Sequence, residues 1–90
     1  MSSVARRVTV HGRVQGVFFR DSCSEEARAR GVTGWVRNDD AGTVSAHFEG
    51  RPDDVEALVA WCGSGPARAR VDDVDVRDVD PEGYGDFEVR

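Results

Sequence analysis

A candidate anion-binding loop lies at residues 12–22, which read GRVQGVFFRDS. A loop that contains Gly16 can curl so that successive backbone N–H groups point inward around an anion. The loop also leads into a predicted helix, whose N-terminus favours negative charge through unpaired N–H groups and the helix dipole. Arg20 adds a full positive charge at the same place. On these residues alone, an ordinary strand-to-helix turn with a surface arginine stays open as the alternative.

Asn38, the only asparagine in the chain, ends the next predicted strand. Its carboxamide can hold one water molecule by donating and accepting hydrogen bonds, although it can equally be a plain strand-end residue entering a turn. A site made of one arginine, backbone N–H groups and one amide lacks a strong general acid. It can still hydrolyse a phosphate whose leaving group needs no proton, such as a carboxylate with a conjugate-acid pKa of about 4. Positioning and charge stabilisation then carry the catalysis.

The composition narrows the class of protein. The chain of 90 residues predicts one domain over residues 1–90, with 39% apolar residues for a modest core. All 12 basic residues are arginine, and the absence of lysine excludes Schiff-base chemistry, a Walker-type lysine and a Ser-Lys dyad. A net charge of −5 argues against a nucleic-acid partner. Short apolar runs exclude a membrane span, and the N-terminus lacks an apolar signal core, so we expect a cytoplasmic protein.

Cysteine, histidine and metal chemistry are not expected at this loop. Cys23 and Cys62 have no metal-ligand spacing, and we interpret both as small buried apolar residues. The acidic residues shortly after Cys23 would repel phosphate, which argues against a nucleophilic thiol. His11 and His47 are expected on the open sheet surface, away from the loop. No metal-ligand cluster or carboxylate pair stands near the loop, so we expect no metal and no cofactor.

The first strand and the first helix flank the loop. Alternation of apolar and polar residues over 8–14 predicts a half-buried strand, which Gly12 interrupts as a bulge or a close backbone approach would. Apolar residues then recur every four positions, at Phe19, Cys23 and Ala27, and predict one face of a helix.

Residues at the two ends of this helix suggest how it begins and ends. Ser22 and Glu25 have the spacing of a capping box at its start, and Gly31 suits its C-terminal end. Phe18 and Phe19 are expected to anchor the loop in the core, which would form the anion cradle in advance.

The remaining elements follow the same reasoning. In the third strand Val44, Ala46 and Phe48 are expected to face inward, and His47 and Glu49 outward. A turn at 39–42 separates the second and third strands. The predicted strands are 32–38, 43–49, 70–80 and a short terminal one at 86–90, and the second helix spans 52–62.

The order β-α-β-β-α-β predicts an α+β fold with both helices on one face of an antiparallel sheet. The strand order is 4-1-3-2, with the short fifth strand at the C-terminus. The first two strands then run toward the same end of the sheet. The loop at 15–20 and Asn38 therefore meet at one edge, although Asn38 lies eighteen positions after Arg20.

Two blocks carry a resemblance to a known family. GRVQGVFFR at 12–20 and GWVRN at 34–38 resemble the acylphosphatase family, whose pattern G-x-V-Q-G-V-x-F-R is long and specific. GTV at 42–44, the GP…A.V segment at 65–71 and the aromatic C-terminal region extend the match over nearly the whole chain. Ala41 departs from the polar residue that the family often has before the turn glycine, which affects the turn rather than the site.

The resemblance implies a ferredoxin-like α/β sandwich and metal-independent hydrolysis of small acyl phosphates to a carboxylate and inorganic phosphate. Arg20 would bind the phosphoryl group with the backbone amides of the loop, and Asn38 would orient the attacking water. We expect a monomeric bacterial enzyme with a small-molecule acyl phosphate substrate and no nucleic-acid or membrane partner. The phosphate-binding residues would be Gln15, Gly16, Val17, Phe18, Phe19 and Arg20.

Two other functions fit the same element order. RNA-recognition domains stack bases on aromatic residues of the open sheet face, where Trp35 is expected here, but the net charge of −5 disfavours this function. An acylphosphatase-like domain of a larger carbamoyl-transfer protein would keep the pocket without turnover, whereas a chain that stands alone favours a free enzyme.

The aspartates at 72–80 are interpreted as charges on an edge strand, with a bulge or strand end near Arg77–Asp78.

Overall fold

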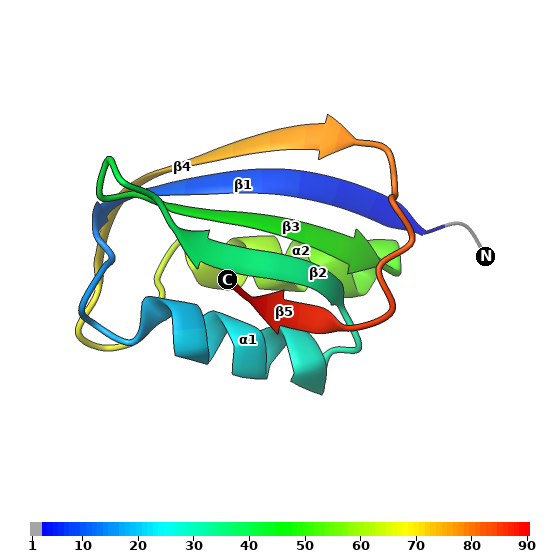
Figure 1. The fold of residues 1–90 in the computed structure, drawn as a ribbon, viewed down its shortest axis with the longest axis horizontal. Coiled ribbons are helices and arrows are strands. Elements are labelled where there is room, and N and C mark those ends of the chain that lie inside the picture. The colour runs from blue at the N-terminus through cyan, green and yellow to red at the C-terminus, as the bar shows by residue number, and fades with distance from the viewer. Residues whose placement is uncertain (1–2) are drawn as a thin grey trace.

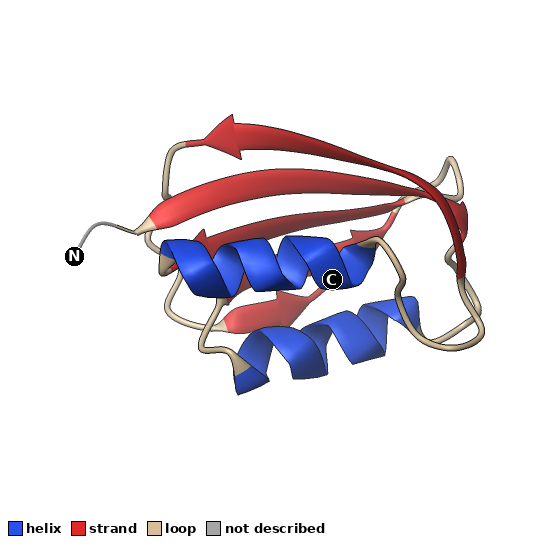
Figure 2. Ribbon diagram, turned by 180° about the vertical axis from the view of Figure 1, so that it is seen from behind, coloured by secondary structure: helices blue, strands red, loops and turns tan. Residues whose placement is uncertain are grey.

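The computed structural model describes residues 3–90 and has one five-stranded sheet with both helices on one face (Figures 1 and 2). The strand order is β4-β1-β3-β2-β5, so the predicted order 4-1-3-2 is confirmed and the short terminal strand lies beside β2. All strand pairs are antiparallel except β2 with β5. The elements are β1 (Val4–Arg13), α1 (Phe19–Ala29), β2 (Thr33–Asn38), β3 (Val44–Gly50), α2 (Pro52–Cys62), β4 (Arg70–Val79) and β5 (Phe87–Val89).

The core lies between the sheet and the two helices. The four-residue spacing in α1 buries Phe19, Cys23 and Ala27 completely or nearly so, as predicted. Helix α2 buries Val55, Leu58 and Cys62 against the same face. Burying a side chain of leucine or phenylalanine size contributes about 1.5–3 kcal/mol, so this helical spacing holds α1 in place. Neither helix, at 11 residues, has the length and apolarity that a membrane crossing requires.

Gly12 produces a bulge in β1, as predicted. The register against β4 shifts between His11 and Gly12, where the backbone of Gly12 has a φ of 128°. A Cβ atom at this position would collide with the carbonyl oxygen of Arg70. The bulge that was considered in the fourth strand is absent, because Arg77 and Asp78 pair in regular register with β1. The strand ends one residue later, at Val79.

Helix α1 begins earlier than a capping box would allow, so that prediction is wrong. Phe18 is the N-cap residue and makes no side-chain capping bond, and the N–H of Ser22 donates to the Phe18 carbonyl at 3.0 Å. Ser22 is therefore already inside the first turn. At the other end Gly31 has a φ of 69°, and the N–H of Val32 donates to the Ala27 carbonyl at 2.9 Å. This pattern is the glycine-terminated helix end that was predicted.

The open face of the sheet is partly covered by the segment that connects β4 to β5 (Figure 1). His47 and Glu49 were expected to face solvent, but they are only 0% and 4% exposed, so that prediction is wrong. The backbone N–H groups of Glu82 and Gly83 donate to the Glu49 carboxylate at 2.5 and 3.0 Å. This segment comes more than thirty residues after β3, and the local alternation in β3 contains no sign of it. His11 is partly exposed and pairs with Asp75 at 2.9 Å, as a surface residue would.

A buried chain of polar contacts connects the covered residues. The Nε of Arg7 donates to His47 Nδ1 at 3.2 Å, and His47 Nε2 lies 2.6 Å from Glu49 Oε2. Because Nδ1 accepts a hydrogen bond, the proton of a neutral imidazole must be on Nε2, where it is donated to Glu49. Burial alone would raise the pKa of Glu49. The hydrogen bonds from Glu82, His47 and Gly83 outweigh that effect and lower its pKa below the usual value.

Replacement of Gly12 by alanine should lower the free energy of unfolding by about 2 kcal/mol or more, because it introduces both a steric collision and an unfavourable backbone conformation. Urea unfolding followed by circular dichroism measures the change. Gly85→Ala is the matched control, since an added Cβ there meets nothing within 4 Å. Equal stability of the two variants would contradict the close approach.

Glu49→Gln should make the protein less sensitive to acid. A carboxylate whose pKa is lowered on folding stabilises the fold above its unfolded pKa of about 4.3, and this stabilisation is lost as the pH falls through the folded pKa. The variant should lose about 1–3 kcal/mol at pH 7 and show a shallower decline in stability below about pH 4. Urea unfolding over pH 3–7 tests this, with Glu56→Gln on the exposed side of α2 as the control. A parallel decline in wild type and Glu49→Gln would rule out the ionic role.

Candidate active site

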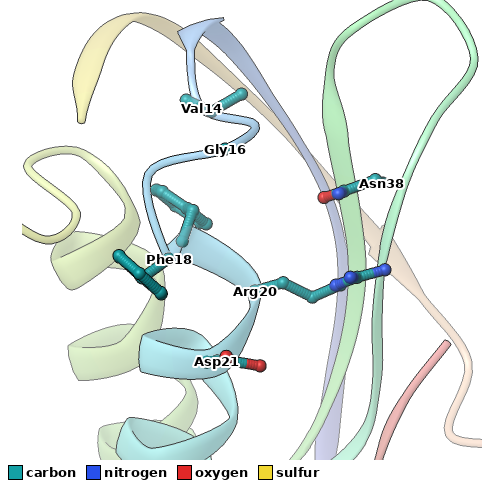
Figure 3. Close-up of a pocket in the computed structure, with 7 residues that line it drawn as sticks. Val14, Gly16, Phe18, Arg20, Asp21 and Asn38 are labelled. Carbon is teal, nitrogen blue, oxygen red and sulfur yellow. The ribbon is translucent and has the colours of Figure 1, made fainter. Parts of the chain in front are cut away.

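A pocket of about 270 Å³ opens where the β1–α1 loop faces the end of β2 (Figure 3). Arg20 and Asn38, which sequence analysis brought to one edge of the sheet, both line it, and their side chains face the gap between α1 and β2. Their convergence is therefore confirmed, while their catalytic roles remain predictions. Asp21 also lines the pocket, although the sequence pattern does not predict it there. The full lining is Val14, Gly16, Phe18, Phe19, Arg20, Asp21 and Asn38.

The loop is shaped by residues in left-handed backbone conformation. Gly16 has a φ of 73° and Phe18 a φ of 64°. Val17 and Phe19 are buried beside the loop, and the Phe19 ring packs 5.2 Å from the Trp61 ring of α2. Phe18, in contrast, is 65% exposed, so the expectation that it anchors the loop in the core is wrong. The left-handed backbone of Phe18 lies between the two buried residues, and Val17 takes the place of Phe18 as the second anchor.

The Gln15 side chain binds the β2–β3 turn. Its Nε2 donates to the carbonyl oxygens of Asp39 at 2.7 Å and Thr43 at 2.9 Å. These two residues close the turn that follows Asn38, since the N–H of Asp39 also donates to the Thr43 carbonyl. Both N–H groups of the Gln15 carboxamide are therefore committed to the protein and are not available to an anion. The local sequence pattern around Gln15 does not indicate this contact, and the residue stands out only as the one glutamine of the chain.

The turn is itself held by Asp39. Its carboxylate accepts hydrogen bonds from Thr43 Oγ1 at 2.7 Å, Ser45 Oγ at 2.5 Å and Arg37 Nε at 3.1 Å. Burial by itself would raise the pKa of Asp39. The hydrogen bonds from Ser45, Thr43 and Arg37 outweigh it, and the pKa lies below its usual value. The ionised carboxylate thus fixes the turn to which Gln15 binds.

Arg20 is held from the opposite side of the pocket. Its Nη1 donates to the carbonyl oxygen of Arg90 at 3.0 Å, and the N–H of Arg90 donates to the Val36 carbonyl at 2.8 Å. The guanidinium of Arg90 lies over the rings of Trp35, at 5.1 Å, and Tyr84, at 5.7 Å. Arg20 lies in the first turn of α1, so its charge and the helix N-terminus act on the same volume.

One group of side chains away from the pocket has the chemistry of a metal site. His47, Glu49 and Glu82 place their potential ligand atoms within 4.8 Å of one another. The guanidinium of Arg7 already fills the cation position, with Nε on His47 and Nη2 on Glu82, each at 3.2 Å. Glu49 in turn accepts two backbone N–H groups. These residues fit a structural ion network better than a bound metal.

The comparisons with known proteins agree with this geometry. Residues 6–89 match the family described as Acylphosphatase. The chain belongs to the acylphosphatase family. The resemblance seen in the two sequence blocks is thereby confirmed, and acyl phosphate hydrolysis is the activity that goes with the family.

Individual relatives cover nearly the whole chain. An acylphosphatase of Haloarcula marismortui is 52% identical over 90 residues, which are 100% of this chain and 99% of the relative. The solved acylphosphatase of Coxiella burnetii superposes with a TM-score of 0.95 at 40% identity, over 98% of this chain and 93% of that one. Full-length HypF matches with a TM-score of 0.92 at 30% identity, over 99% of this chain and 12% of HypF. Because archaea occur among the relatives as well as bacteria, family membership does not select a bacterial source.

Replacing Gln15 by glutamate tests the tie between loop and turn. The variant keeps the side-chain size but loses both donors, and its carboxylate would face two carbonyl oxygens, so we expect a loss of about 1–3 kcal/mol. Backbone amides of residues 15–20 should also exchange faster with deuterium, which NMR detects. Gln15→Leu, which lacks the charge, separates loss of donors from repulsion. Unchanged exchange in both variants would contradict the role of Gln15.

Proposed function

We propose that the pocket hydrolyses small acyl phosphates, with Arg20 and the backbone N–H groups of residues 15–20 binding the phosphoryl group. Asn38 then holds the water that attacks phosphorus. The observation that carries the proposal is that Arg20, Gly16 and Asn38 line one pocket at the N-terminus of α1. The products are a carboxylate and inorganic phosphate.

Charge stabilisation accounts for most of the expected rate. In phosphoryl transfer the negative charge is spread over three equatorial oxygens, which the forked guanidinium of Arg20 and the loop N–H groups can bind together. The hydrogen bond to Arg90 leaves the other guanidinium N–H groups of Arg20 for a ligand. Because the donors are already in position, they cost little reorganisation when the charge develops.

No residue of the pocket is needed as a general acid. The leaving carboxylate has a conjugate-acid pKa of about 4 and departs without a proton. The proton of the attacking water passes to a phosphoryl oxygen of the substrate. His11 and His47 are engaged elsewhere, with Asp75 and with Arg7 and Glu49 respectively.

We propose that the reaction is metal-independent, since the lining offers N–H donors that bind phosphate oxygens directly. We also propose a monomeric cytoplasmic enzyme without a nucleic-acid partner. Its two cysteines are buried free thiols, which fits a reducing compartment.

The open sheet face does not favour the RNA-binding alternative. Trp35 is only 4% exposed, and the guanidiniums of Arg7, Arg37 and Arg90 lie 5.2, 4.8 and 5.1 Å from its ring centre. Its faces are thus occupied by the protein rather than presented to a base. A second candidate is a domain that binds phosphate without turning it over. Full-length HypF, to which this chain is 30% identical, was solved in a phosphate- and nucleotide-bound form.

Loss of acetyl phosphate in the presence of excess chelator tests the proposal. Wild type should be active, and Arg20→Ala and Asn38→Ala should each lower kcat/KM about 100-fold or more, as removal of a preorganised charge-stabilising or positioning group does. Arg68→Ala removes an exposed arginine outside the pocket and should match wild type.

Inhibition by inorganic phosphate separates the two roles. Arg20→Ala should lose it, because the phosphoryl site is removed, whereas Asn38→Ala should keep it, because only the water is displaced. Full activity of Arg20→Ala would show that the site is assigned wrongly. An inactive wild type that still binds phosphate would select the binding domain instead.

A further inference from the structure

Phe18 has two features that the fold does not require. It is 65% exposed, although it is large and apolar, and it lines the pocket. Among residues 3–90 it is also the only non-glycine residue with a left-handed backbone, at a φ of 64°. For a bulky side chain both features cost free energy, and such outliers concentrate at functional sites.

The ring of Phe18 is not needed to anchor the loop. Val17 and Phe19, on either side of it, are 6% and 1% exposed and provide the contacts with the core. The family pattern G-x-V-Q-G-V-x-F-R likewise leaves the position of Phe18 open. The side chain is therefore free to serve the ligand that enters the pocket.

The direction of attack decides which part of the ligand meets Phe18. In an in-line displacement the attacking water and the leaving oxygen lie on opposite sides of phosphorus. Asn38, the proposed water ligand, lies on β2, whereas Phe18 lies on the loop side, across the pocket from it (Figure 3). A phosphoryl group bound by the loop and Arg20 would thus direct its acyl group toward the side of Phe18.

We propose that the Phe18 ring contacts the acyl group of the substrate and gives the enzyme a preference for apolar, above all aromatic, acyl phosphates. The inference rests on the proposed function and adds a substrate class to it. An aromatic contact of this kind strengthens binding when both rings leave water. A methyl group, as in acetyl phosphate, is too small to cover the ring.

The ratio of kcat/KM for benzoyl phosphate to that for acetyl phosphate measures this preference. Phe18→Asn should lower the ratio about five- to tenfold, since asparagine accepts the left-handed backbone but offers no apolar ring. Phe18→Leu should fall between wild type and Phe18→Asn. Val76→Ala, which shortens an apolar side chain on β4 that is 43% exposed, should leave the ratio unchanged.

A binding measurement separates this inference from the proposed function. Benzoylphosphonate and acetylphosphonate carry a P–C bond in place of the cleavable linkage, and their relative affinities can be measured whether or not the protein is an enzyme. We expect wild type to prefer the benzoyl compound and Phe18→Asn to lose that preference. An inactive wild type that keeps the preference would overturn the function but support the contact. An unchanged affinity ratio in Phe18→Asn, with phosphate still bound, would overturn the contact.

Discussion

Two hydrogen bonds from one carboxamide hold the halves of the candidate site together. Gln15 Nε2 connects the β1–α1 loop to the carbonyl oxygens of Asp39 and Thr43, which close the turn after Asn38. The loop at residues 15–20 follows β1 whereas Asn38 ends β2, and these two strands are not neighbours in the sheet, because β3 lies between them. Without this bridge, Asn38 would be positioned relative to the loop only through β3 and through the contact of Arg20 with Arg90. The ionised Asp39 carboxylate makes the turn a firm support for it.

The face of the sheet opposite the helices is largely covered by other parts of the protein. The β4–β5 segment, which binds the buried Glu49, and the arginines around Trp35 cover this face. One of these arginines, Arg90, accepts a hydrogen bond from Arg20 through its carbonyl oxygen. These contacts thus stabilise the sheet and hold Arg20 from the side opposite the loop. In RNA-recognition domains with the same element order, this face is the binding surface. Here that face is occupied by the C-terminal segment and by arginines of β1 and β2 that lie over Trp35.

Sequence patterns predicted correctly those features that depend on residues close together in the chain. The four-residue spacing of Phe19, Cys23 and Ala27 predicted α1, Gly31 predicted its end, and Gly12 predicted the bulge. The strand order followed from connection rules, and with it the meeting of Arg20 and Asn38. Ser22 and Glu25 have the residue types and the spacing of a capping box. That prediction is wrong because the helix begins earlier, with Phe18 as its N-cap.

The sequence by itself determined the element order, the core positions of the two helices, the family and the two residues on which the chemistry is proposed to depend. Tertiary structure alone decided that His47 and Glu49 are buried, because the segment covering them lies more than thirty residues away in the chain. It also decided that Gln15 binds the turn and that Phe18 rather than Val17 faces solvent. Alternation and spacing report which residues share a face, but they do not report what covers that face. That depends on where distant segments pack.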